Sequence, residues 1–265
     1  MKIDLNSLRI DAIYDIQSSI NIINTSMKWS ELFTEVKRLC DQFLNAGCAS
    51  IFIDLKPETA KQNFCRAAEN WRRLGAVANQ HYGVHLSLNH NDYLFAGMIA
   101  GDINLVNAVK NSLSTHYYPN EEYRENFHIT WLLVLLVLQG RSLSDSVLSH
   151  IKALEMEDNN ECRVVLAKSL LKLEEQTETD FWDAFGELIS SYEIQVEKRS
   201  KLLTTSMTEF GARRYLNFEA LVWLKLAMTF GFTRNGVFRF CPEELINSQA
   251  IEYKKDWIIL NDLSV

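Results

Sequence analysis

The stretch FHITWLLVLLVL, residues 127–138, decides the fold class because it is apolar on every side when it is wound as an α-helix. A helix without a polar face has to be covered by other elements on all sides. The run is also much shorter than the roughly 20 apolar residues that cross a bilayer. We therefore predict that it forms the central, fully covered helix of an all-α protein.

The sequence on both sides of this run has the spacing of helices. The 265 residues include only three prolines and ten glycines, and this scarcity favours long helices over many short strands. Apolar residues recur three or four positions apart, which is helical periodicity. The predicted helices cover residues 5–20, 29–43 (closed by Gly47), a stretch opened by Pro57, 93–99 (stopped by Gly101), a stretch capped by Asp102, and then about 143–156, 162–173, 181–203 and 218–230.

The sequence contains no fixed-period repeat, and no stretch rich in Gly, Ser or Pro separates the helices as a linker would. We expect one domain over residues 1–265, with residues 1–80 as a subregion. Its helices, about ten in number, should form an irregular array of helical hairpins. After Val237, the pieces FRF (238–240) and IEYKKDWIIL (251–260) are expected to form short strands or a docked segment.

The composition is that of an ordinary globular protein, with 47% hydrophobic and 23% charged residues. A total of 27 Lys and Arg against 34 Asp and Glu gives a formal net charge of −7. This balance disfavours nucleic acid as a partner, because phosphate contacts need clustered cations. The N-terminal stretch MKIDLNSLRIDAIYD carries acids where a signal peptide needs an uninterrupted apolar run. We expect a cytoplasmic protein that binds neither nucleic acid nor membrane.

The stretch HYGVHLSLNHND, residues 81–92, is the best candidate for a metal site. His81 and His85 would share one face of a helix, and His90 and Asp92 follow closely. Two imidazoles and a carboxylate can hold a divalent metal, as in a metal-dependent hydrolase. Gly83 between the two histidines and the turn-like residues 87–89 favour surface or turn histidines instead, and we expect no metal.

No catalytic motif is recognisable elsewhere. The sequence has no GxSxG elbow and no glycine-rich phosphate loop. Adjacent acids such as Glu121 and Glu122 would diverge on a helix rather than face one substrate. The five cysteines lack metal-ligand spacing and are expected to be reduced and buried: Cys40, Cys48, Cys65, Cys162 and Cys241. We expect a protein that is not an enzyme and that needs no cofactor.

The negative charge is concentrated in one part of the chain. Residues 155–197 contain twelve acids and three bases, a net charge of −9, so the remainder of the chain is close to +2. An acidic region of this kind attracts a basic protein, accelerates association and selects the partner. The residues that we expect to bind such a partner are Glu155, Glu157, Asp158, Glu174, Glu175, Glu178, Asp180, Asp183 and Glu187.

A solvated acidic face is the simpler interpretation of the same residues. Thr177 and Asp180 have the spacing of a capping box, which is a structural reason for one of the acids. Asp183 and Glu187, in contrast, form a like-charged i,i+4 pair that opposes helix stability. If the helices are antiparallel, the turns near Asp158 and Gln176 lie roughly 20 Å apart, so the acids would form a long strip. Both interpretations remain open at this point.

The C-terminal third resembles a known family. The stretch RYLNFEALVWLKLAMTFGF (214–232) followed by VFRFCPEEL (237–245) resembles the end of the bacterial immunity-protein-49 family, where an apolar helix leads into a short hydrophobic segment and a closing PxxL. The matching residues are Leu221, Leu224, Ala227, Gly231, Pro242 and Leu245. Residues 181–199 and 92–109 resemble two further helical segments of that family, so the resemblance covers patches between residues 70 and 245. Phe240 and Cys241 depart from the pattern.

The resemblance implies an all-helical cytoplasmic immunity protein, an antitoxin of a polymorphic or contact-dependent secretion system. Such a protein binds and neutralises a cognate toxin or effector, and the family supplies no catalytic residues. The mechanism that we favour is stoichiometric occlusion, in which the acidic helices cover a cationic surface of the toxin. A nuclease is the toxin class that we expect. The alternative is a helical-repeat-like adaptor or scaffold that binds a peptide or protein partner.

Overall fold

The computed structural model describes residues 4–202, 204–234 and 236–260. These residues form twelve α-helices and contain no strand. The helices are α1 (Leu5–Ile22), α2 (Trp29–Phe52), α3 (Pro57–Val77), α4 (Asp92–Ala100), α5 (Ile103–Ser112), α6 (Arg124–Gln139), α7 (Asp145–Glu155), α8 (Glu161–Leu171), α9 (Glu178–Lys201), α10 (Met207–Phe210), α11 (Phe218–Thr229) and α12 (Glu243–Asn247). The prediction of an all-α fold is confirmed.

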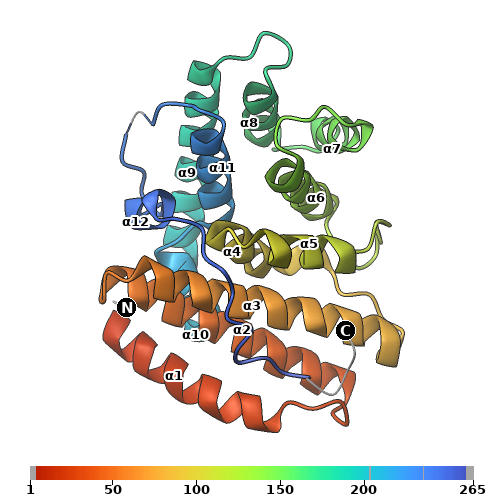
Figure 1. Cartoon of the computed structure of the whole chain (residues 1–265), viewed down its shortest axis with the longest axis vertical. Helices are drawn as coiled ribbons and strands as arrows, with labels where there is room; N and C mark the ends of the chain where they lie inside the picture. The colour runs from red at the N-terminus through yellow and green to blue at the C-terminus, as the bar shows by residue number, and fades with distance from the viewer. Residues whose placement is uncertain (1–3, 203, 235, 261–265) are drawn as a thin grey trace.

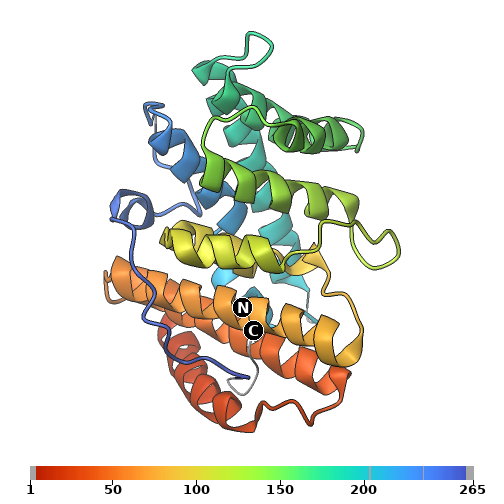
Figure 2. The same cartoon turned by 45° about the vertical axis from the view of Figure 1, so that its right-hand side comes forward.

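The helices are stacked in chain order along the longest axis of the molecule (Figure 1). Helix α2 packs between α1 and α3, and α4 and α5 cover the other side of α3. Helices α6, α7 and α8 continue the stack (Figure 2). The long helix α9 then runs back along the stack and leads to α10, which packs against α2. The acidic α8–α9 turn therefore lies at one end of the long axis, far from α1 to α3.

Helix α6 is buried over residues 129–136, as the apolar run predicted. It packs against α4, α5, α7 and α11. A single hydrophobic core extends from Ala12 in α1 to Leu260 near the C-terminus. No helix of the described residues is long and apolar enough to cross a membrane.

Several helix ends lie where the sequence predicts them, because the signals are local. Pro57 occupies the first turn of α3, and Gly101 ends α4 with a left-handed φ of 83°. The Asp102 carboxylate accepts hydrogen bonds from the first free N–H groups of α5. Thr177 and Asp180 form a complete capping box at the start of α9. The expected end of this helix at residue 203 lies outside the described residues.

One expectation is wrong, and of the two forms expected for the C-terminal segment the structure has the docked one. Gly47 does not close α2, which continues to Phe52. Instead, Gly47 lies inside the helix at a close contact with Phe64 of α3, where a Cβ atom would be 2.5 Å from Cε1 of that ring. The C-terminal segment, residues 248–260, forms no strand but docks across α3 (Figure 1). Asn70 of α3 holds this segment by donating to the carbonyl of Trp257 and accepting from the N–H of Ile259.

Candidate functional site

The acidic surface, which we define as the nine expected partner-binding residues, lies on α7, on α9 and in the α7–α8 and α8–α9 turns. Lys168 of α8 joins two of its members: the Nζ atom lies 2.5 Å from Oε1 of Glu155 and 2.5 Å from Oε2 of Glu174. These two acids flank the turns that the sequence placed about 20 Å apart. Since they share one ammonium group, this part of the acidic surface is a compact cluster rather than a long strip.

Three further members of the acidic surface have structural partners. Glu157 pairs with Arg124 of α6 at 2.9 Å. Glu178 accepts hydrogen bonds from the indole of Trp182 and from the N–H of Thr233. Asp180 caps its own helix, and these hydrogen bonds lower its pKa. These three acids stabilise the fold and are less available to a partner.

The remaining four members, Asp158, Glu175, Asp183 and Glu187, are exposed, and no hydrogen bond or ion pair joins their carboxylates to another described residue. An exposed apolar side chain accompanies them, because Met156 in the α7–α8 turn is 69% exposed. Exposed carboxylates and an exposed apolar side chain in the same part of the chain have the composition of a protein-binding surface with a charged rim.

The α8–α9 turn holds part of this surface in an unusual backbone conformation. Lys172, Glu174 and Glu175 have left-handed φ angles of 56°, 50° and 62°. For residues with a Cβ atom, this conformation costs roughly 1–2 kcal/mol each. The like-charged neighbours Glu174 and Glu175 therefore lie at one end of the molecule, in a turn whose backbone conformation is energetically unfavourable.

The structure separates the four residues of the histidine stretch. His81 is exposed, whereas His90 packs against the rings of Phe33 and Trp71, and burial lowers its pKa. Asp92 pairs with an arginine of another element, which is described below. Among the described residues, no group of three or more His, Cys, Asp or Glu side chains is arranged to hold a metal ion.

His85, the fourth of these residues, lies at a hollow of about 760 Å³. Its ring stacks on Tyr118 with a centroid distance of 4.1 Å, and its Nε2 lies 3.4 Å from Oε1 of the buried Glu122. Burial raises the pKa of Glu122, but hydrogen bonds from His85 and from the N–H groups of Leu88 and Tyr118 outweigh burial, so the pKa lies below its usual value. The carboxylate therefore stays ionised and fixes the imidazole. These contacts hold residues 83–88 against residues 117–122.

A second histidine arrangement has no counterpart in the sequence reasoning. His128 of α6 and His150 of α7 approach each other with their Nδ1 atoms 2.9 Å apart. Burial, followed by the charge of His128, lowers the pKa of His150 to about 4. Both rings are therefore neutral near pH 7, and one donates a hydrogen bond to the other. The only sequence signal for this pair is a histidine inside the apolar run of α6.

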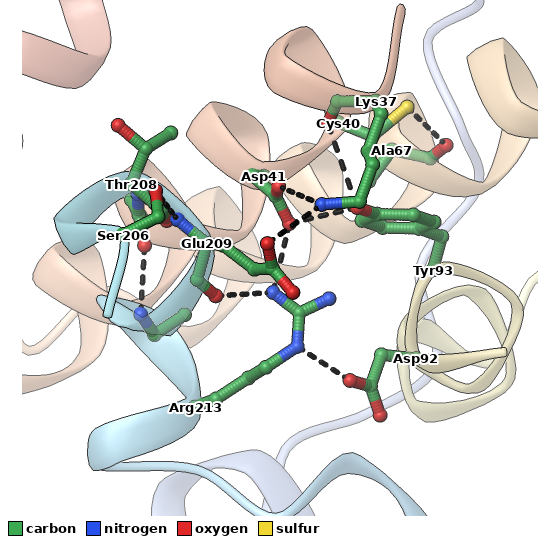
Figure 3. A network of polar contacts seen from close by, with 12 residues as sticks. Lys37, Cys40, Asp41, Ala67, Asp92, Tyr93, Ser206, Thr208, Glu209 and Arg213 are labelled. Carbon is green, nitrogen blue, oxygen red and sulfur yellow. Dashed lines mark hydrogen bonds and ion pairs between the residues drawn. The ribbon is translucent and has the colours of Figure 1, made fainter. Parts of the chain in front are cut away.

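A buried network of charges connects distant parts of the chain (Figure 3). Arg213 lies at its centre, with Nη1 2.8 Å from Asp41 of α2 and Nε 2.6 Å from Asp92 of α4. The Tyr93 hydroxyl donates to the same Asp41 at 2.8 Å, and Lys37 contacts both Asp41 and Glu209. These contacts hold α10 and the following turn against α2 and α4.

The cysteines are buried or half-buried and free of disulfides, as expected. Burial raises the pKa of Cys65 and of Cys241 to about 12, and it also raises the pKa of the other three thiols. A thiol acts as a nucleophile only when it is deprotonated. The cysteines therefore contribute packing rather than chemistry.

A second hollow, of about 710 Å³, opens where the end of α2, the end of α9 and residues 238–242 meet. Its walls are aromatic and its edge is cationic. The residues that define it are Phe52, Lys201, Arg214, Tyr215, Arg239 and Phe240. No sequence pattern predicts this hollow, because its residues come from four separate segments of the chain.

Compared with known proteins, the chain matches no family model, no curated protein and no solved structure. The residues that carry the resemblance to the immunity-protein-49 family have packing roles here: Leu221, Leu224, Ala227 and Leu245 are fully buried. Gly231 follows α11 with a left-handed φ of 83°. The resemblance is thus one of helical packing, and the function that it implies is a proposal.

Proposed function

We propose that this chain is an immunity protein that binds a cognate bacterial toxin or effector and neutralises it by stoichiometric occlusion. The observation that carries the proposal is the acidic surface, in which Asp158, Glu175, Asp183 and Glu187 are exposed without a partner among the described residues. These acids add to the net charge of −9 of residues 155–197 but make no contact that the fold uses. A basic partner would explain why they are present.

The proposed mechanism assigns separate roles to charge and apolar contact. The carboxylates would accelerate encounter with a cationic surface, and Met156 would be buried on binding and slow dissociation. A nuclease is the toxin class that fits, because its substrate-binding surface is cationic. In this proposal the chain is not an enzyme and acts only by covering the toxin.

The test is co-expression with the product of the adjacent upstream gene, whose C-terminal domain should be toxic to cells if the proposal holds. Rescue of cell growth and co-purification with the toxin domain would support the proposal, and failure to rescue despite soluble expression of both proteins would refute it. The acidic-surface variant carries Asp158→Lys, Glu175→Lys, Asp183→Lys and Glu187→Lys. It should associate more slowly by stopped-flow fluorescence and show a weaker salt dependence.

A matched control changes the net charge equally at exposed acids elsewhere. It carries Asp11→Lys, Glu121→Lys, Glu244→Lys and Glu252→Lys, none of whose carboxylates has a hydrogen bond or ion pair to another described residue. If the control slows association as much as the acidic-surface variant, net charge rather than this surface governs the encounter. If neither variant changes the kinetics, the interface lies elsewhere.

The second candidate function is an adaptor that binds a peptide or protein partner. The hollow at the end of α9 favours it, because aromatic walls with arginines at the edge are typical of the core of a protein interface.

A further inference from the structure

The hollow at the end of α9 has a rigid aromatic floor. Phe240 packs edge-on against Tyr192 of α9 at a centroid distance of 5.2 Å, and Phe238 stacks on Trp182 at 5.7 Å. On the opposite wall, Phe52 of α2 packs on Tyr215 at 5.8 Å. Trp182 and Tyr192 lie outside the lining and hold Phe238 and Phe240, so this aromatic floor exists before any ligand binds.

The edge of the hollow is cationic. Lys201, Arg214 and Arg239 line it, against one acid, Glu197. Arg239 is neutralised by an ion pair with Glu193. Lys201 and Arg214 have no ion pair with another described residue, although Arg214 lies over the Phe210 ring. Two positive charges at the edge are therefore available to an anionic ligand.

Apolar side chains continue from the hollow onto the surrounding surface. Val237 next to the hollow is 83% exposed, and Leu202 beside Lys201 is 58% exposed. Phe52 in the wall and Leu55 just beyond α2 are also exposed. Exposed apolar groups that adjoin a concave site with a polar rim are typical of a protein-binding surface.

Charge and shape together select the class of ligand. A free phosphate or a nucleic-acid backbone would leave the aromatic walls unused, and two unpaired cations are few for a polyanion that requires clustered bases. A neutral apolar ligand would leave Lys201 and Arg214 without partners. A peptide with an apolar side chain between carboxylates would satisfy both parts of the site.

We propose that this hollow binds an acidic peptide segment of a protein partner, with an aromatic or aliphatic side chain inserted between the phenylalanines and carboxylates on Lys201 and Arg214. Phe238 of the hollow stacks on Trp182 near the start of α9, and Lys201 lies about 21 Å along the helix from Glu187, the member of the acidic surface nearest to it on α9. This proposed site is independent of toxin binding. An acidic peptide bound there would be the ligand in the adaptor function.

The test uses the full chain and a fluorescein-labelled peptide of sequence EEFDEL, with QQFNQL as its uncharged counterpart. Fluorescence anisotropy should show binding of EEFDEL and binding of QQFNQL that is weaker by about tenfold or more. Lys201→Gln and Arg214→Gln should each weaken binding of EEFDEL by about fivefold or more, with little effect on QQFNQL.

The matched controls are Lys198→Gln and Arg199→Gln, which remove a charge from the same last turn of α9 without touching the hollow. These controls should leave the affinity for EEFDEL nearly unchanged. Equal losses in the control variants, equal affinities for the two peptides, or no binding at about 1 mM peptide would each overturn the proposal. Tighter binding of labelled single-stranded DNA that depends on Lys201 and Arg214 would also overturn it.

Discussion

Replacing Arg213 by methionine tests whether the buried charge network stabilises the fold. The Asp41 side chain is only 3% exposed and now receives the Arg213 guanidinium at 2.8 Å. In the Arg213→Met variant, Asp41 would keep the Tyr93 hydroxyl and Lys37, whose Nζ is 3.4 Å away. Removing one partner of a buried ion pair costs about 3–5 kcal/mol when the other charge is left uncompensated, and the two partners that Asp41 keeps place this variant near the lower figure. We expect a loss of this size in the free energy of unfolding.

The two carboxylates that contact Arg213 should respond differently. The Asp92 side chain is 31% exposed, so water can replace the guanidinium there. Asp92→Asn should therefore cost only roughly 1.5 kcal/mol, the lower end of the range for a hydrogen bond to a charged group. A surface control is Arg9→Met, which removes an ion pair to Asp54 between side chains that are both about one-third exposed. That variant should cost about 1 kcal/mol or less.

Urea unfolding at pH 7, followed by far-UV circular dichroism, measures these differences. A double-mutant cycle of Arg213→Met with Asp41→Asn should give a larger coupling energy than a cycle with Asp92→Asn. The reasoning is refuted if Arg213→Met costs about as little as Arg9→Met. It is also refuted if the coupling to Asp92 is the larger one.

Three further predictions concern packing, pH and the C-terminal segment. Acid should destabilise the protein as the pH falls from about 6.5 to about 4, because the unfolded chain takes up the His150 proton before the folded one. His150→Gln should flatten this dependence in thermal melts, and an equally steep slope would contradict the assignment. Gly47→Ala should cost about 1–3 kcal/mol because its Cβ atom would overlap Phe64, and an unchanged melting temperature would mean that the ring moves aside. Asn70→Ala should release residues 257–259, which hydrogen exchange with mass spectrometry would detect as lost protection; unchanged protection would mean that other contacts suffice.

The sequence predicts those helix ends that are set by the chemistry of a single nearby residue. Pro57, Gly101 and Asp102 set helix ends through their own backbone or side chain, so these ends lie where the sequence placed them. Gly47 misled the prediction because its role depends on a ring 17 positions further along the chain. Whether a glycine ends a helix or admits a neighbouring ring depends on tertiary packing.

The candidate sites were less accessible to sequence reasoning for the same physical reason. The acids of residues 155–197 could be counted, but their partners could not be foreseen, because Lys168 reaches Glu155 through the packing of α7 on α8 and reaches Glu174 through the fold of the α8–α9 turn. The hollow at the end of α9 needs α2, α9 and residues 238–242 to meet. No spacing in the sequence signals such a meeting.

The acids of α9 can be divided by what the helix itself requires. Glu178 and Asp180 lie in the first turn, and three bases occupy the last turn, so both sets interact favourably with the helix dipole. That effect fades within one turn, so it does not account for Asp183 and Glu187 further along. These two acids are exposed and one helical turn apart, an arrangement that costs about 0.2–0.5 kcal/mol.

Asp183→Asn combined with Glu187→Gln should therefore raise the free energy of unfolding by a few tenths of a kcal/mol, and more at low salt. If the acidic surface binds a basic toxin, the same variant should also associate with it more slowly. Glu178→Gln offers the contrast, since it should lower stability by removing a favourable charge and the acceptor for Trp182 and Thr233. A gain in stability with unchanged association would make Asp183 and Glu187 part of a solvated face, whereas a gain in stability with slower association would mean that they are retained for binding.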